Sequence, residues 1–82
     1  MTFKEYEIAN KIRELAKNGT TSITKIAEAM EANRQLVHEY IQRLVKKGIV
    51  AEYPPNAFNA IQLTENAGAL IKSADKKYKK FL

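Results

Sequence analysis

Four polar side chains between residues 34 and 42 are of types that recognise nucleic-acid bases. They recur at intervals of three and four residues, which would place them on one exposed side of a helix: Arg34, Gln35, His38 and Gln42. Arginine can form two hydrogen bonds with O6 and N7 of guanine, and glutamine can do the same with N6 and N7 of adenine. These residues are therefore the candidates for direct contact with base edges, and the alternative is that they are ordinary solvated surface residues.

Metal and catalytic chemistry find little support in this composition. The chain has one histidine, His38, and no cysteine, so disulfides, thiolate sites and a histidine-based zinc site lack their ligands. No phosphate-binding glycine loop, nucleophile–histidine pair or convincing cluster of carboxylates occurs. We therefore expect no enzyme, no cofactor and no metal.

The helix that must carry the candidate residues is predicted over residues 34–47. Asn33 is a capping residue directly before it, and Gly48 ends it. An apolar stripe lies on its opposite side: Val37, Ile41 and Leu44. Three cations near its C-terminal end either flank a nucleic-acid groove or only complement the helix dipole: Arg43, Lys46 and Lys47.

A shorter helix is predicted immediately before this one. It begins near Ser22 or Thr24, ends near Met30, and has an apolar edge formed by Ile23, Ile26, Ala27 and Met30. Hydroxyls, free backbone N–H groups and a lysine at its start suit a phosphate: Thr21, Ser22, Thr24 and Lys25. Ordinary helix capping is a second interpretation of these residues, and the two are compatible.

The remaining segments predict two further helices and a hairpin. A helix over residues 2–18 has the inward stripe Ile8, Ile12 and Leu15, and Phe3 and Tyr6 fall off that stripe. Thr64 and Glu65 open a last, amphipathic helix over about residues 65–81. Residues 20–23 suit a short extended piece. Strand-like patterns over residues 49–53 and 60–64 flank the turn Pro54-Pro55-Asn56.

Length and charge are consistent with one small domain and an acidic partner. The 82 residues carry a formal net charge of +5, and residues 72–82 hold five lysines against one aspartate. The basic balance favours nucleic acid, although most of it lies outside the predicted helix over 34–47. No apolar run reaches the length of a membrane span, and no signal peptide is recognisable, so we expect a cytoplasmic protein without a membrane partner.

The segment IAEAMEANRQLVHEYIQRLVKKGIV, from Ile26 to Val50, resembles the winged helix-turn-helix family of DNA-binding regulators. The predicted hairpin and the segment Leu63-Thr64-Glu65-Asn66-Ala67 are similar to the wing and last helix of its MarR-like branch. This resemblance implies an α+β, mostly helical winged-helix fold, with a single domain over residues 1–82. It also implies a sequence-specific double-stranded DNA-binding protein, most simply a transcriptional repressor.

In that family the second helix of the motif enters the major groove, which here is the helix over 34–47. The resemblance therefore implies a DNA-contacting set: Ser22, Thr24, Lys25, Asn33, Arg34, Gln35, His38, Gln42 and Arg43. Two positions depart from the family. Glu31 stands where the turn often has glycine, and residues 53–59 of the wing contain no Arg or Lys. A wing contact with DNA would then come from Asn56 or Asn59. Tyr53 and Phe58 either contact a protein or pack against the chain's own core.

The terminal helices predict self-association. The last helix has a long apolar face, and exposed apolar surface usually marks an interface. We expect a two-fold homodimer contact, as in MarR-like proteins, made by Phe3, Tyr6, Leu70, Ile71, Ala74, Tyr78 and Phe81. The alternative is that the last helix folds back and completes the core of a single chain.

One other function class stays open. The uncharged wing and apolar last helix also fit a winged-helix protein-interaction module, for example within a replication or virus-encoded complex. A small-molecule effector, common in MarR-like dimers, is neither supported nor excluded by the residues.

Overall fold

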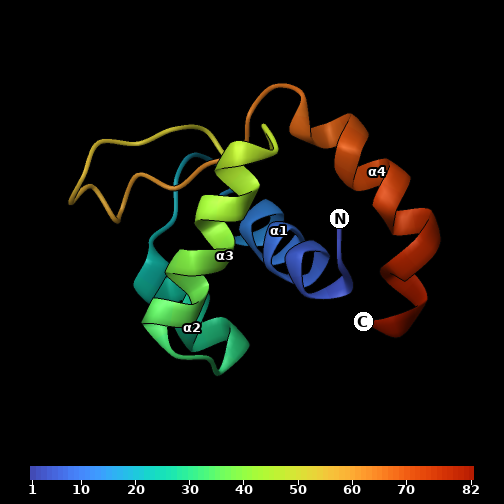
Figure 1. The fold of residues 1–82 in the computed structure, drawn as a ribbon, viewed down its shortest axis with the longest axis horizontal. Helices are drawn as coiled ribbons and strands as arrows, with labels where there is room; N and C mark the ends of the chain where they lie inside the picture. Colours follow the sequence, from blue (N-terminus) through green and yellow to red (C-terminus); the bar gives the residue numbers. More distant parts are fainter.

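The computed structural model describes residues 1–82 as four α-helices, a short 3-10 helix and connecting loops (Figure 1). The elements are α1 (Phe3–Leu15), α2 (Ile23–Met30), α3 (Arg34–Lys46), α4 (Ala67–Tyr78) and η1 (Lys79–Phe81). Figure 1 shows α1 in the middle, with α2 and α3 on one side and α4 on the other. α1 contacts α2, α3 and α4, whereas α1 is the only α-helix that α4 contacts. α1 is therefore the centre of the fold.

Side-chain caps explain where three of the helices begin. Thr2 and Glu5 form a reciprocal capping box at the start of α1, with Thr2 N–H donating to Glu5 Oε1 at 2.7 Å. The Ser22 hydroxyl accepts from the backbone N–H of Lys25 at 3.1 Å, and Asn33 Oδ1 accepts from that of Leu36 at 3.0 Å. The starts predicted for α2 and α3 are therefore confirmed.

The core is formed by the apolar sides of the helices and by three residues of the long loop. The predicted inward stripe of α3 is confirmed, since Val37, Ile41 and Leu44 are fully buried. On α1 the prediction is only partly right. Leu15 is 38 % exposed, because α1 ends there, whereas Tyr6 is fully buried because α4 covers a second side of α1.

The last helix begins two residues later than predicted. The Thr64 hydroxyl donates to the carbonyl oxygen of Gly48 at 2.5 Å and so does not cap the helix. Asn66 occupies the cap position without a side-chain hydrogen bond, and α4 starts at Ala67. The expected helix over about 65–81 is therefore α4 followed by one 3-10 turn.

The predicted hairpin is not present as a pair of strands. Two isolated antiparallel bridges join Thr21 to Ile61 and Val50 to Leu63. Between the bridges, Pro54 and Pro55 offer no N–H group to a ladder, and the tip folds into local turns instead. The expected strands over 49–53 and 60–64 are therefore loops paired at single positions. The extended piece expected over 20–23 is a loop paired at Thr21, and Ile23 already belongs to α2. The fold is mostly helical. None of its helices is both long and apolar enough to cross a membrane.

Candidate nucleic-acid interface

The turn between α2 and α3 contains a residue in a left-handed conformation. Glu31 has φ 53° and ψ 42°, a region in which L-residues other than glycine are disfavoured. Its backbone N–H reaches the carbonyl oxygens of Ala27 and Glu28 and closes the end of α2. The acidic residue that stands where the family often has glycine is therefore strained but keeps the usual cap geometry.

The N-terminal end of α3 presents two side chains with no partner inside the chain. Arg34 and Gln35 are exposed, and neither takes part in a side-chain hydrogen bond or a salt bridge. Together with His38 they border a hollow of about 260 Å³, which is completed by Ile23 and Phe58. The structure thus brings three of the four predicted base-reading residues to one place.

The loop after α3 contacts two of the predicted residues, His38 and Gln42, directly. The ring of Phe58 lies edge-on to that of His38, with centroids 5.8 Å apart. The Gln42 amide donates to the hydroxyl of Tyr53 at 2.8 Å. Burial raises the pKa of this hydroxyl, although the bond from Gln42 acts in the opposite direction. His38 and Gln42 are therefore positioned by the loop.

These loop contacts were left open by sequence reasoning. Tyr53 is half-buried against the core, while Phe58 stays 38 % exposed beside α3. The available signal was two aromatic residues in a loop without Lys or Arg. That signal predicts packing but does not identify the helix that receives it.

Sequence reasoning also missed Glu39. It is exposed on α3, four residues after Gln35 and three before Gln42, so it shares their face of the helix. A carboxylate in this position can accept a hydrogen bond from N4 of cytosine and repels a phosphate. The spacing 35-39-42 was the signal that could have found it.

The predicted phosphate contacts at the start of α2 fall into two groups. Thr24 and Lys25 are exposed in the first turn, and Ser22 is half-buried and caps the helix. Thr21 is buried and paired with Ile61, so its hydroxyl cannot reach a phosphate. That hydroxyl also has no hydrogen-bond partner in the chain.

The cations at the end of α3 differ in their surroundings. The Arg43 guanidinium lies 4.7 Å from the centre of the Tyr40 ring, and Lys46 is exposed. Lys47 donates to the buried carboxylate of Glu5 at 2.8 Å, which joins α3 to the first turn of α1. Burial alone would raise the pKa of Glu5, but the bonds from Lys47 and Thr2 bring it down to about 2. Lys47 is therefore a structural residue.

A second polar contact joins α1 to α4. Asp75 accepts two hydrogen bonds of 3.0 Å from Arg13 and one of 2.5 Å from the hydroxyl of Tyr6. The bonds from Arg13, and then that from Tyr6, lower the pKa of Asp75 to about 2. This contact explains why Tyr6 faces inward, and no local pattern in the sequence indicates it.

The residues predicted for a dimer contact have different degrees of burial. Tyr6 and Ile71 are fully buried in the single chain, so the expectation that their side chains are free for a second copy is wrong. Phe3, Ala74 and Tyr78 are half-buried against the core, whereas Leu70 and Phe81 are exposed, the latter by 63 %. Phe3 stacks edge-on with both Tyr78 and Phe81, which covers part of the apolar face within the chain.

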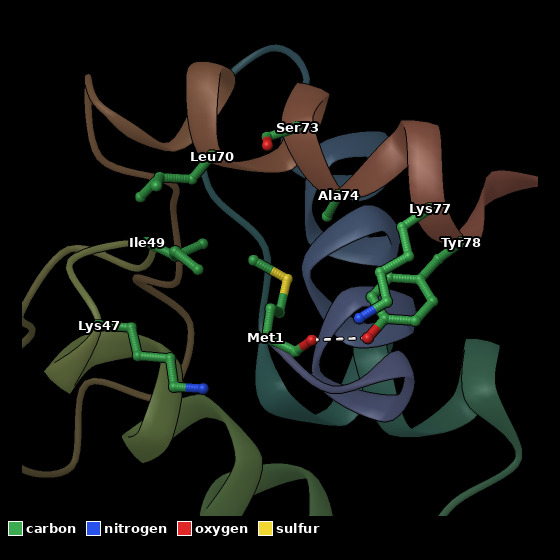
Figure 2. Close-up of a pocket in the computed structure, with 8 residues that line it drawn as sticks. All are labelled: Met1, Lys47, Ile49, Leu70, Ser73, Ala74, Lys77 and Tyr78. Atoms are coloured by element: carbon green, nitrogen blue, oxygen red, sulfur yellow. Dashed lines mark hydrogen bonds between the residues drawn. The ribbon is translucent and has the colours of Figure 1, made fainter.

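An apolar hollow of about 340 Å³ lies between α4, the end of α3 and Met1 (Figure 2). Figure 2 shows the hydroxyl of Tyr78 donating to the carbonyl oxygen of Met1, at 2.8 Å, on one wall. Eight residues line the hollow: Met1, Lys47, Ile49, Leu70, Ser73, Ala74, Lys77 and Tyr78.

No group of three or more His, Cys, Asp or Glu side chains that could hold a metal ion occurs in the chain.

The comparisons with known proteins agree with the arrangement of α2 and α3. No curated protein and no solved structure matched the chain. A family model did match, over a segment that runs from the second half of α1 through α2, the turn and α3 to Ala51. Residues 12–51 match the family described as winged helix-turn-helix DNA-binding, and this match supports a helix-turn-helix DNA-binding transcription regulator.

Proposed function

We propose that this chain is a sequence-specific double-stranded DNA-binding regulator that reads the major groove with α3. The observation that carries the proposal is the state of Arg34 and Gln35. Both are exposed and without partners, at the N-terminal end of a helix whose other side is fixed in the core. In helix-turn-helix proteins the N-terminal residues of the second helix contact base edges.

The rest of the interface follows from this placement. Thr24 and Lys25 at the start of α2, with the Ser22 cap, suit a phosphate on the flank of the groove. Asn33 caps α3 beside Arg34, and Arg43 supplies a charge near the other end. His38 and Gln42 reach bases in an orientation set by the loop contacts with Phe58 and Tyr53.

The proposal includes a homodimer of the MarR-like kind, most simply a repressor. It is supported by Leu70 and Phe81, which stay exposed on α4 and η1, and by the apolar hollow next to Leu70. With Tyr6 and Ile71 inside the core, the contact reduces to Phe3, Leu70, Ala74, Tyr78 and Phe81. Two α3 helices about 34 Å apart would then read a roughly palindromic site.

Selection of bound duplexes from a random library tests the proposal. A selected motif with two-fold symmetry is the expected result, and sedimentation should give twice the mass of the chain. The Arg34→Ala variant should lose preference for one base pair, whereas Lys4→Ala, which removes the same charge from α1, should keep it.

Two outcomes would overturn the proposal. If the wild-type protein binds selected and scrambled duplexes with equal affinity, sequence-specific reading by α3 is excluded. No binding to any duplex at micromolar protein and low salt would favour a protein-interaction module, in which the exposed ring of Phe58 on the uncharged loop is the contact.

A further inference from the structure

The outward side of α4 and η1 carries a row of lysines. Lys72 and Lys76 are four residues apart on α4, about 6 Å along the helix axis, and Lys80 follows in η1; all three are exposed. The buried side of α4 consists of Ala67 and Ile71, packed toward α1. We call Lys72, Lys76 and Lys80 the lysine ridge.

No acidic group offsets the charge of the lysine ridge. Asp75 is the only acidic residue between residues 66 and 82, and its carboxylate faces α1, where Arg13 and Tyr6 bind it. Lys77 is not part of the ridge, because it lines the apolar hollow on another side of α4 (Figure 2). Lys80 does not line the hollow, and its ammonium lies 5.2 Å from the centre of the exposed Phe81 ring. The ridge is therefore an uncompensated positive surface.

The lysine ridge and the exposed side of α3 lie on different parts of the molecule. Figure 1 shows α1 between α4 and the pair α2 and α3, and α4 packs against no other α-helix than α1. A straight duplex held against α3 would therefore pass on the other side of α1 from the lysine ridge.

From these observations we infer that the lysine ridge is a second, sequence-independent binding surface for the phosphates of a separate DNA segment. Lysine is a mobile point charge on a flexible stem, which suits a phosphate backbone but does not select bases. A second copy of this chain is a poor occupant of the same surface, because like charges would face each other. The inference adds a second contact to the proposed function, but the ridge itself does not depend on base reading by α3.

A lipid surface fits the lysine ridge less well than DNA. Basic helices that lie on membranes insert a free apolar side into the lipid. Here most of that side of α4 is already used, since Ala67 and Ile71 are fully buried, and the large apolar residues that remain exposed are Leu70, Phe81 and Leu82. Binding to lipid vesicles is therefore measured as a competing outcome of the test.

The test measures affinity for a random-sequence duplex as a function of salt. The variant Lys72→Gln, Lys76→Gln, Lys80→Gln should lower the slope of log K against log salt by about 2–3, because each phosphate contact contributes about 0.9. The variant Lys4→Gln, Lys11→Gln, Lys17→Gln removes the same charge from α1 and the following turn. It should change the slope by less than about 1.

Capture of a second duplex tests whether the two surfaces act together. Wild type bound to an immobilised, selected duplex should retain a labelled random duplex from solution. The variant of the lysine ridge should bind the immobilised duplex as before but retain at least fivefold less of the label.

The outcomes separate this inference from the proposed function. Equal slopes for the two triple variants, or equal capture of the label by wild type and the variant of the lysine ridge, would overturn the inference. The inference would also be overturned if the variant of the lysine ridge bound DNA as wild type does and lost only binding to vesicles of 30 % phosphatidylserine in phosphatidylcholine. If Arg34→Ala leaves sequence preference intact while the slope result holds, the reading by α3 fails and the lysine ridge stands.

Discussion

The side-chain amide of Gln42 donates a 2.8 Å hydrogen bond to the hydroxyl of Tyr53. This bond joins the exposed side of α3 to the loop that follows it, and the contact between Phe58 and His38 joins the same two elements again. The loop in the position of a wing therefore acts on the candidate reading surface from within the chain, although its residues 53–59 carry no charge.

Gln42 and Tyr53 should be energetically coupled. In a double-mutant cycle with Gln42→Ala and Tyr53→Phe, the free energy of unfolding should show an interaction of about 0.5–1 kcal/mol, because the bond is partly exposed to solvent. Urea denaturation of the four proteins measures this value. Strictly additive effects would mean that the bond is not formed in solution.

Arg34→Ala should weaken binding to the selected duplex by about 1–3 kcal/mol and relax specificity at one base pair. The free energy of unfolding should change by less than about 0.5 kcal/mol, because Arg34 has no partner in the chain. Fluorescence anisotropy and urea denaturation give the two numbers. A variant that loses stability as well as affinity would instead indicate a structural role.

Glu31→Gly should stabilise the fold by about 0.5–1 kcal/mol, because it removes the strain of a left-handed residue other than glycine. Glu28→Gly, one turn earlier inside α2, removes the same charge and should destabilise by about 1 kcal/mol. Thermal unfolding of both variants checks the opposite signs. Equal shifts in one direction would show that charge, not backbone conformation, decides the effect.

The stability of the fold should fall in acid. Glu5 and Asp75 have pKa values of about 2 in the fold, below their ordinary values of 4.5 and 3.8. Because the unfolded chain binds protons first, their contribution is complete above about pH 5 and is lost as the pH falls towards 2. The free energy of unfolding, measured by urea denaturation at each pH, should follow this profile.

Asp75→Asn should flatten that acid profile. It should also cost on the order of 2 kcal/mol at pH 7, because the charge that Arg13 and Tyr6 bind is lost. Glu65→Gln, at an exposed carboxylate without a partner, is the matched control and should leave the profile unchanged. An unchanged profile for Asp75→Asn would contradict the contact between α1 and α4.

Thr21→Val should stabilise the fold by about 1 kcal/mol. The Thr21 hydroxyl is buried without a partner, and valine keeps its shape without the polar group. Thr20→Val, at the exposed neighbouring residue, should have almost no effect. Destabilisation by Thr21→Val would show that the hydroxyl has a partner in solution.

Local signals in the sequence were sufficient to predict where α2 and α3 begin and which side of α3 faces the core. The side chains of Ser22 and Asn33 cap the two helices by accepting from backbone N–H groups three residues later, and the stripe of Val37, Ile41 and Leu44 needs only helical spacing to identify its inward side. The place of Arg34 and Gln35 on the exposed side follows from the same spacing. These features depend on residues within four positions of each other.

The predictions that failed depended on contacts between distant residues. Tyr6 faces inward, where Asp75, 69 residues later, accepts a hydrogen bond from its hydroxyl. Thr64 leaves the last helix uncapped because its hydroxyl donates to the carbonyl oxygen of Gly48. The hairpin is the exception, because Pro54 and Pro55, which offer no donors to a ladder, are a local signal present in the sequence itself. Spacing along the chain contains no information on which distant partner a residue will meet.

The carboxylate of Glu5 accepts from the backbone N–H of Thr2 and from the ammonium of Lys47 through the same oxygen. One atom therefore secures both the first turn of α1 and the far end of α3. Fraying of that turn should consequently weaken the contact with the end of α3 as well. Hydrogen exchange at the start of α1 should thus report on how firmly α3 is held against α1.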